Sequence, residues 1–171
     1  ADYQIKIASN GKSGLELAVE ISPDIIISDV MMPVMDGISM LEQLKKDIRT
    51  SHIPVIMLTA KADITSKLTG LAKGADEYLP KPFHEKELRI RLKNLIEMRQ
   101  RLQEHFASMT PADSHLRDKS LIIENEFIRK VRSHMEDNIA NEEFDIQNLC
   151  HEIAMSRAQL YRKFKALTGK S

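Results

Sequence analysis

Four stretches in the first half of the chain carry the hydrophobic pattern of β-strands. Residues 25–29, 53–60 and 75–83 are short, largely apolar runs that lie near proline or glycine. Runs of this length are too short for helices, so they predict strands buried on both faces of a parallel sheet. Residues Tyr3–Ala8 alternate loosely between apolar and polar positions, which predicts an outer strand.

Helical periodicity fills the intervals between these runs. Ser13–Ile21 and Ile38–Lys46 carry apolar residues three and four positions apart, and residues 62–73 predict a further helix that ends at Gly74 as its C-cap. Strands and helices therefore alternate through the first hundred residues. This order predicts an α/β fold with a doubly wound parallel sheet.

The stretch from His84 to about Phe106 predicts one long helix. Its apolar residues alternate at spacings of four and three if Arg99 is counted as a polar member of the series. The series is Leu88, Leu92, Leu95, Leu102 and Phe106. Two interpretations remain open: a single amphipathic helix that covers a sheet, or a linker helix that pairs in a homodimer.

A polar segment, residues 108–119, contains Pro111 and has no period, so it predicts a linker. The chain then divides into residues 1–98, a helical extension and linker at 99–120, and a second domain at 121–171. The helix Glu124–Asn138 of this second domain is expected to bury four of its residues. They are Phe127, Ile128, Val131 and Met135.

Two short helices follow in the second domain. Asp145 is a candidate N-cap for Ile146–Ile153, and Ser156 is a candidate N-cap for a helix that runs to about Leu167. We expect Ile146, Leu149, Cys150 and Ile153 to face inward in the first helix, and Leu160, Phe164 and Leu167 in the second. Helices joined so closely predict an all-α helix-turn-helix domain.

Composition limits the class of protein. The 171 residues carry 25 basic and 25 acidic side chains, and 42% are hydrophobic, which is typical of globular domains. Cys150 is the single cysteine, so an intrachain disulfide is excluded and a reducing compartment is expected. Because no apolar run approaches the ~20 residues of a membrane span, we expect a cytoplasmic location, although a longer parent protein could be membrane-anchored.

Three reactive side chains follow the three predicted buried strands. Asp29 ends the first run, Thr59 ends the second, and Lys81 ends the third between Pro80 and Pro82. The carboxyl ends of parallel strands meet at one edge of an open sheet, where ligands bind. A carboxylate could act there as nucleophile toward a phosphoryl group, while a hydroxyl and an ammonium neutralise the phosphoryl oxygens.

The stretch from Tyr3 to about Met98 resembles the receiver domain of bacterial two-component response regulators. The matching residues are Asp29, Met31-Met32-Pro33, Asp36-Gly37, Leu58-Thr59-Ala60, Gly74-Ala75-Asp76-Glu77-Tyr78 and Lys81-Pro82-Phe83. The resemblance implies that Asp29 accepts phosphate from a histidine kinase and that Thr59 and Lys81 bind the phosphoryl oxygens. It also implies that Thr59 and Tyr78 form the switch, and that the Lys81–Pro82 peptide bond is cis.

A whole receiver opens with a central strand, an acidic pair that helps to bind Mg²⁺, and a first helix. This chain begins after the corresponding segment, so the expected fold lacks the first strand and helix. The expected metal ligands are Asp29 and the main-chain carbonyl of Met31, with the acidic pair missing. The chain is then a fragment of the folded unit, or its domain is rearranged or completed by another chain.

The last helix carries an unusual charge pattern. Residues 155–171 contain five basic side chains and no acidic one. A face without acids is typical of a DNA-binding helix, and the candidate contacts are Arg157, Ala158, Gln159, Tyr161, Arg162 and Lys165. Residues 146–171 also resemble the first helix-turn-helix of AraC-type transcription regulators, on Leu149, Ala154-Met155-Ser156, Leu160 to Lys165 and Leu167 to Ser171.

These observations predict a phosphorylation-controlled transcription regulator. A receiver joined to an AraC-type domain resembles the output end of a hybrid two-component sensor, so the expected partners are a histidine kinase domain and double-stranded DNA. An enzyme is not expected, because an aspartyl phosphatase needs a second acid two residues after its nucleophile and Met31 stands there. The alternative is a receiver that acts as a phosphate-independent protein-interaction module.

Overall fold

The computed structural model describes residues 3–60, 74–108 and 122–169. The chain divides into two compact units, Ala1–Leu95 and Ile96–Ser171. The division falls inside a long helix, α4 (Glu85–Ser108). The helix predicted at residues 62–73 and most of the predicted linker lie outside the described residues.

The first unit contains a parallel sheet of three strands in the order β1-β2-β3. These are β1 (Ile26–Asp29), β2 (Val55–Ala60) and β3 (Glu77–Lys81). Residues Ile26 to Asp29 pair with Val55 to Leu58, and Ile56 to Ala60 pair with Glu77 to Lys81. The α/β fold with a parallel sheet is therefore confirmed.

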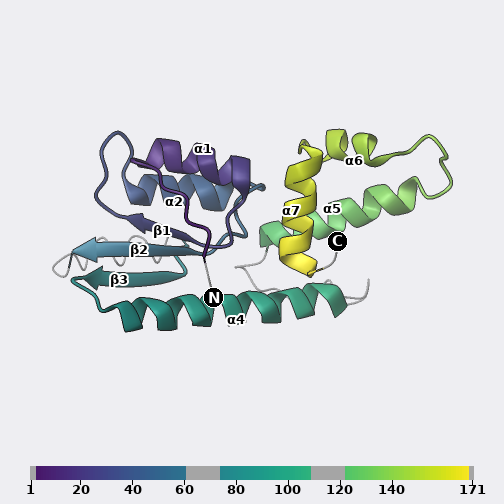
Figure 1. The fold of residues 1–171 in the computed structure, drawn as a ribbon. Helices are drawn as coiled ribbons and strands as arrows, with labels where there is room; N and C mark the ends of the chain where they lie inside the picture. Colours follow the sequence, from purple (N-terminus) through teal and green to yellow (C-terminus); the bar gives the residue numbers. More distant parts are fainter. Residues whose placement is uncertain (1–2, 61–73, 109–121, 170–171) are drawn as a thin grey trace. The chain divides into compact units, whose positions relative to one another are not determined.

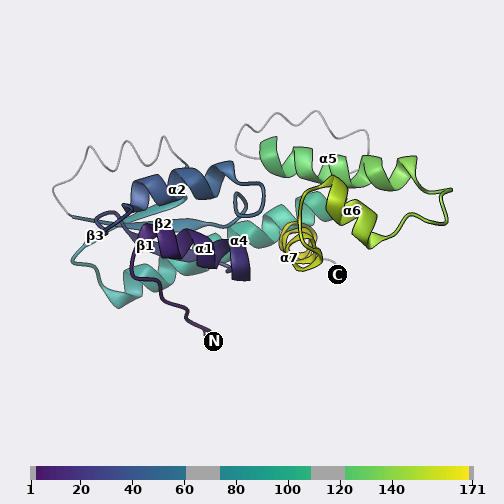
Figure 2. The ribbon, with the colours of Figure 1, turned by 90° about the horizontal axis from the view of Figure 1, so that it is seen from above.

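Helices cover both faces of this sheet (Figure 1). α1 (Gly11–Ile21) and α2 (Gly37–Lys46) lie side by side on one face (Figure 2). Their buried residues join those of the sheet in one core cluster that includes Ala18, Leu41, Leu44, Val55 and Met57. On the other face, the first half of α4 packs Leu95 against Ile56 and Leu79.

The packing of α4 decides between the two interpretations of its heptad pattern for its first half. Leu88 and Leu92 are partly buried in the same cluster as Leu95, so these three leucines face this chain's own sheet. They are not available to pair with a second helix. The side chains of Leu102 and Phe106 lie outside the described residues, and a homodimer through the receiver or the 84–106 helix stays a prediction.

The predicted outer strand at Tyr3–Ala8 is wrong. Residues 3–8 run as an extended segment that forms no strand (Figure 2), and Ile5 and Ile7 are 76% and 88% exposed. A strand exists only when its backbone groups find a ladder partner. No described strand pairs with these residues, so their alternating pattern does not lead to a strand.

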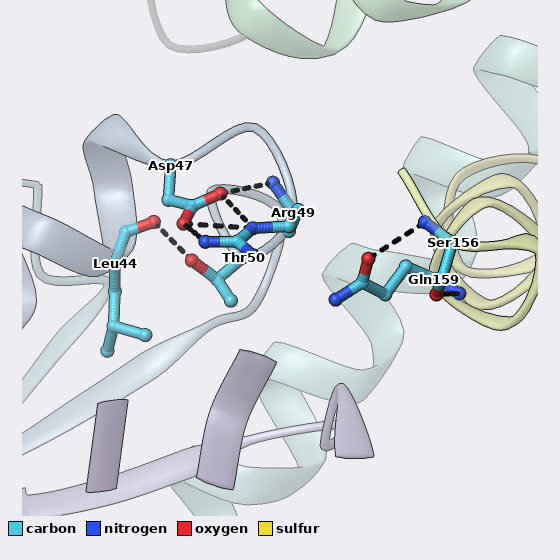
Figure 3. Close-up of polar contacts among 6 residues, drawn as sticks. All are labelled: Leu44, Asp47, Arg49, Thr50, Ser156 and Gln159. Carbon is cyan, nitrogen blue, oxygen red and sulfur yellow. Dashed lines mark hydrogen bonds and ion pairs between the residues drawn. The ribbon is translucent and has the colours of Figure 1, made fainter. Parts of the chain in front are cut away.

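A polar turn connects α2 to β2 (Figure 3). The Asp47 carboxylate accepts hydrogen bonds from the Arg49 backbone and guanidinium, and the buried Thr50 hydroxyl donates to the Leu44 carbonyl at 2.8 Å. These bonds satisfy groups at the end of α2 and so fix where the helix stops. A second anchor lies at the start of β2, where Asp76 accepts from the Lys45 ammonium and from the Val55 amide.

The second unit contains α5 (Ile122–Asp137), α6 (Ile146–Glu152) and α7 (Arg157–Thr168). Both predicted N-caps are present. Asp145 and Asn148 form a capping box at α6, and Ser156 and Gln159 form another at α7 (Figure 3). Because these caps are local, sequence spacing alone was sufficient to place them.

Burial in the second unit departs from the prediction at several positions. Leu149, Ile153, Leu160 and Leu167 are buried as expected. Met135 and Ile146 are instead exposed, and Phe164 and Cys150 are only partly buried.

Candidate functional site

Asp29 stands at the carboxyl end of β1, at the same edge of the sheet as Thr59 and Lys81. The pairing register sets Asp29 opposite Leu58, directly before Thr59, and sets Ala60 opposite Lys81. The Lys81 ammonium forms an ion pair with Asp29 Oδ2. The structure therefore brings the three sequence-predicted side chains to one edge.

The environment of Asp29 keeps its carboxyl group ionised. Burial raises the pKa of Asp29, but hydrogen bonds from the Lys81 ammonium and the Met31 amide outweigh this effect. The result is a pKa below the usual value of an aspartate. The carboxylate is also within reach of solvent, because its side chain is 35% exposed. An accessible, charged carboxylate is the state that a nucleophile requires.

The loop after β1 holds Asp29 in place through a glycine. The Gly37 amide donates to the Val30 carbonyl at 2.9 Å, and a Cβ atom at Gly37 would lie 2.0 Å from the Asp29 carbonyl oxygen. Only glycine permits this approach of two backbone segments. Sequence reasoning singled out Gly37 as part of a motif but not for this reason, because the approach is visible only in three dimensions.

Asp36 has a different task from Asp29. Its carboxylate caps α2 by accepting hydrogen bonds from the Ser39 amide and hydroxyl, both at 2.8 Å. The bond from the Ser39 amide is the main reason that the pKa of Asp36 is lowered. The cap secures the start of α2 next to the Asp29 loop.

Thr59 and Tyr78 both lie inside the first unit. Thr59, the penultimate residue of β2, is buried, and Tyr78 of β3 is buried among the core residues of the sheet and α2. Among the described residues the Tyr78 hydroxyl has no hydrogen-bond partner, and burial raises its pKa. A buried hydroxyl without a partner costs free energy. Packing of the Tyr78 ring in the hydrophobic core must therefore stabilise the inward position of this side chain.

The peptide bond between Lys81 and Pro82 is cis, as predicted. The bond directly follows the residue whose ammonium reaches Asp29.

Oxygen ligands for a metal ion are few at this edge. Asp29 and the carbonyl of Met31 are oxygen donors of the type that Mg²⁺ prefers. Throughout residues 3–60, 74–108 and 122–169, however, no three His, Cys, Asp or Glu side chains are grouped so that they could hold a metal ion. Binding of Mg²⁺ by Asp29 and the Met31 carbonyl therefore stays a prediction.

The predicted DNA contacts lie on α7 with unequal exposure. Arg157, Ala158, Tyr161 and Lys165 are exposed on one face, with the Lys165 ammonium 5.7 Å from the centre of the Tyr161 ring. Arg162 is partly buried and lies at the border of this face. Gln159 is also partly buried, and its amide oxygen already accepts from the Ser156 amide.

Fold and site together define a doubly wound α/β domain with a carboxylate, a hydroxyl and an ammonium at one sheet edge. Residues 1–93 match the family model of the response regulator receiver domain. This match covers more than half of the sequence, so the chain belongs to the response regulator receiver domain family of two-component systems. The predicted receiver is confirmed, whereas the AraC-type resemblance of the second unit stays a prediction.

Relatives include sensor kinases and transcriptional regulators. The chain is 43% identical to "Histidine kinase P4" of Formosa agariphila over 98% of its own length, but spans only 12% of that protein. It is 41% identical to "DNA-binding dual master transcriptional regulator RpaA" of Synechocystis over 60% of this chain and 42% of that protein. The chain thus spans less than half of the length of either relative.

Solved receiver structures agree with the fold. A putative response regulator from Chloroflexus aurantiacus superposes with a TM-score of 0.51 at 37% identity, over 53% of this chain and 74% of that one. The receiver domain of sensor histidine kinase PA1611 from Pseudomonas aeruginosa gives a TM-score of 0.52 at 29% identity, over 56% of this chain and 78% of that one. In the part of this chain that the structure describes, no helix is both long and apolar enough to cross a membrane.

Proposed function

We propose that this chain accepts a phosphoryl group on Asp29 from a histidine kinase and passes the signal to a DNA-binding unit formed by α6 and α7. The observation that carries the first half is the ion pair between Lys81 and Asp29 at the edge of the sheet where Thr59 lies next to the end of β2. The pair places an ammonium next to an ionised carboxylate from a different strand.

The transfer needs one bond to form and one to break. An Asp29 carboxylate oxygen attacks the phosphorus of a phosphohistidine, the P–N bond breaks, and the leaving imidazole takes up a proton. Asp29 becomes an acyl phosphate. The Lys81 ammonium then lies beside the added negative charge, and the Thr59 hydroxyl donates to a phosphoryl oxygen, which stabilises the transferring group.

We also propose that the transfer depends on Mg²⁺. Asp29 and the Met31 carbonyl would contribute oxygen ligands, and the ion would neutralise charge on the phosphoryl oxygens. The solved receiver of PA1611 is described with a magnesium ion in its active-site cleft, which supports this part of the proposal. The acidic pair that the resemblance to receivers implies would come from residues other than those described.

Phosphorylation is tested by incubating a longer protein, in which an N-terminal segment supplies the acidic pair, with a small-molecule phosphodonor and Mg²⁺ and measuring its intact mass; the chain of 171 residues alone should take up phosphate poorly. The wild-type chain should gain one phosphoryl group, and Asp29→Asn should gain none. Asp36→Asn is the matched control, because it removes an acid from the same loop and retains a side chain that can cap α2. Equal uptake by the wild type and Asp29→Asn would refute the assignment of the phosphoacceptor.

The proposed DNA-binding unit is supported by the turn between its two short helices. Ile153 is the C-cap of α6, Ala154 adopts a positive φ of 55°, and Ser156 caps α7. This compact connection presents the exposed side of α7, with Arg157, Tyr161 and Lys165, as one continuous face. A face of this composition suits the major groove, with basic side chains on phosphates and base edges.

A hybrid two-component sensor is the proposed parent. The similarity to "Histidine kinase P4" extends over 98% of this chain, and so includes the helices of the second unit. A kinase and its receiver in one polypeptide would give the receiver a phosphodonor at high effective concentration.

We assign DNA binding to the second unit alone. The test is a titration of a duplex pool with the wild-type chain and with the α7 variant Tyr161→Ala/Lys165→Ala. Equal binding by the two proteins would refute the assignment of DNA binding to α7.

A further inference from the structure

A lysine and a glutamate are buried between α7 and α5. Lys163, in the middle of α7, is 1% exposed, and Glu124, in the first turn of α5, is 4% exposed. The Lys163 ammonium lies 3.9 Å from Glu124 Oε1 and 4.9 Å from the centre of the Phe127 ring. Phe127 itself is fully buried, one turn after Glu124 on the same helix.

Stability alone does not account for this pair. Removing two charges from water costs several kcal/mol for each ion, and replacing a buried ion pair by apolar residues is often neutral or stabilising by ~1–4 kcal/mol. Apolar side chains of similar volume at both positions would therefore hold α5 and α7 together equally well. The best-attested use of a buried polar pair is to select one arrangement among several.

The position of Lys163 shows which arrangement is selected. The buried side of α7 consists of Leu160, Lys163, Ala166, Leu167 and Thr168, so Lys163 lies near the centre of that side. Apolar neighbours tolerate small rotations of a helix about its own axis, because hydrophobic contact is not directional. An ammonium that must meet both a carboxylate and a ring face tolerates far fewer.

We infer that Glu124 and Lys163 are positioning residues that set the rotation of α7 about its axis, and thereby decide which α7 side chains face DNA. This inference rests on the proposed DNA-binding function. Successive residues on a helix are ~100° apart, so a modest rotation would turn Tyr161 or Lys165 away from a groove. The pair thus controls discrimination between DNA sequences more than overall affinity.

The test compares two double variants of the full chain. Glu124→Leu/Lys163→Met replaces the buried pair by apolar residues without leaving one charge alone. Glu126→Gln/Lys130→Met removes the charges from an exposed pair on α5, whose Nζ–Oε1 distance is 3.5 Å. Wild-type protein first enriches duplexes from a library with a randomised centre, and each variant is then titrated against the enriched and the unselected pools.

We expect the apolar variant to keep its melting temperature while its preference for the enriched pool falls about tenfold, the scale of one lost base contact. Its α7 amide signals in a ¹H–¹⁵N spectrum should broaden or double. The exposed-pair control should match the wild type in both measurements. Undiminished preference together with a sharp α7 spectrum in the apolar variant would overturn the inference, as would a large drop in its melting temperature.

The two proposals fail in different ways. If wild-type protein enriches no duplex, DNA binding is refuted. In that case the α7 spectrum of the apolar variant still decides whether the pair orients the helix.

Discussion

Lys81 and Asp29 form an ion pair although their strands are not neighbours. Asp29 ends β1 and Lys81 ends β3, and β2 lies between the two strands. The lysine therefore reaches across the carboxyl end of β2, where Thr59 is located. The ion pair thus connects β1 and β3, the two outer strands of the described sheet, at the proposed site of phosphorylation.

Loss of this ion pair should change the titration of Asp29. In Lys81→Met, burial is no longer opposed by the ammonium, so the pKa of Asp29 should rise from its lowered value. The measurement is a ¹³C NMR titration of the Asp29 carboxyl. Lys86→Met, on the exposed side of α4, is the control and should leave the titration unchanged. An unaltered Asp29 titration in Lys81→Met would show that the pair does not form in solution.

The N-cap of α2 should make stability depend on pH. At neutral pH, Asp36→Ala should lower the free energy of unfolding by ~1 kcal/mol, because the Ser39 groups lose their acceptor. The pKa of Asp36 is lowered in the folded state. Its contribution is therefore present above the unfolded pKa of about 4 and is lost as the pH falls through the lower folded value.

Urea denaturation of the wild type and Asp36→Ala at several pH values checks this dependence. The difference between the two should shrink below about pH 4, where the carboxyl group becomes protonated. Asp36→Asn retains a capping oxygen and should lose little stability at neutral pH. A difference that stays constant into acid would mean that the charge on Asp36 contributes nothing to the cap.

Gly37→Ala should damage the proposed site. The new methyl group would meet the Asp29 carbonyl oxygen at 2.0 Å and the Met57 methyl at 2.8 Å, so the backbone must move. Overpacking of this kind costs ~1–3 kcal/mol. Phosphate uptake at Asp29 should fall as well, because the displaced atom belongs to the phosphoacceptor residue.

Gly14→Ala is the matched control for this substitution. Gly14 lies in α1, and a Cβ atom there would meet mainly the sulfur of the flexible Met40 side chain, at 3.0 Å. Thermal denaturation and intact-mass assays of both variants suffice. Normal phosphate uptake by Gly37→Ala would contradict the importance of this close approach.

The hydroxyl of Tyr78 should be dispensable for stability. The hydroxyl has no hydrogen-bond partner among the described residues. Tyr78→Phe should therefore leave the free energy of unfolding unchanged or raise it by up to ~1 kcal/mol, which a melting-temperature measurement detects. Tyr161→Phe, at an exposed position, is the control. A drop in stability for Tyr78→Phe would show that the hydroxyl does form a hydrogen bond in solution.

Two α7 variants should separate phosphate contacts from base contacts. Lys165 is exposed near the end of α7, so Lys165→Ala should weaken binding to specific and random duplexes alike. It should also reduce the slope of log affinity against log salt by about 1. Arg162→Ala should instead reduce the preference for the specific duplex. Titrations at several salt concentrations measure both quantities, with Lys130→Ala on α5 as the control. Equal losses on both duplexes in Arg162→Ala would reassign Arg162 to phosphate.

Local signals in the sequence were sufficient for much of the fold and for the candidate site. The apolar runs before Asp29, Thr59 and Lys81 predicted strands whose ends meet, and the structure has them in a parallel sheet. Asp145 and Ser156 were placed as caps because a cap depends on residues only two or three positions away. The strand ends and the caps are properties of short segments, so their spacing along the chain predicts them.

Tertiary packing decided what neighbouring residues do not encode. Tyr3–Ala8 has an alternating pattern but forms no strand, because pairing needs a partner from elsewhere. The leucines at 88, 92 and 95 fit a heptad, yet they cover the sheet. Lys163 belongs to an acid-free basic stretch, yet it is buried, and its ammonium lies near Glu124 and Phe127 of another helix. A charged side chain is buried only where distant residues supply its counter-charge, and the fold alone determines which residues those are.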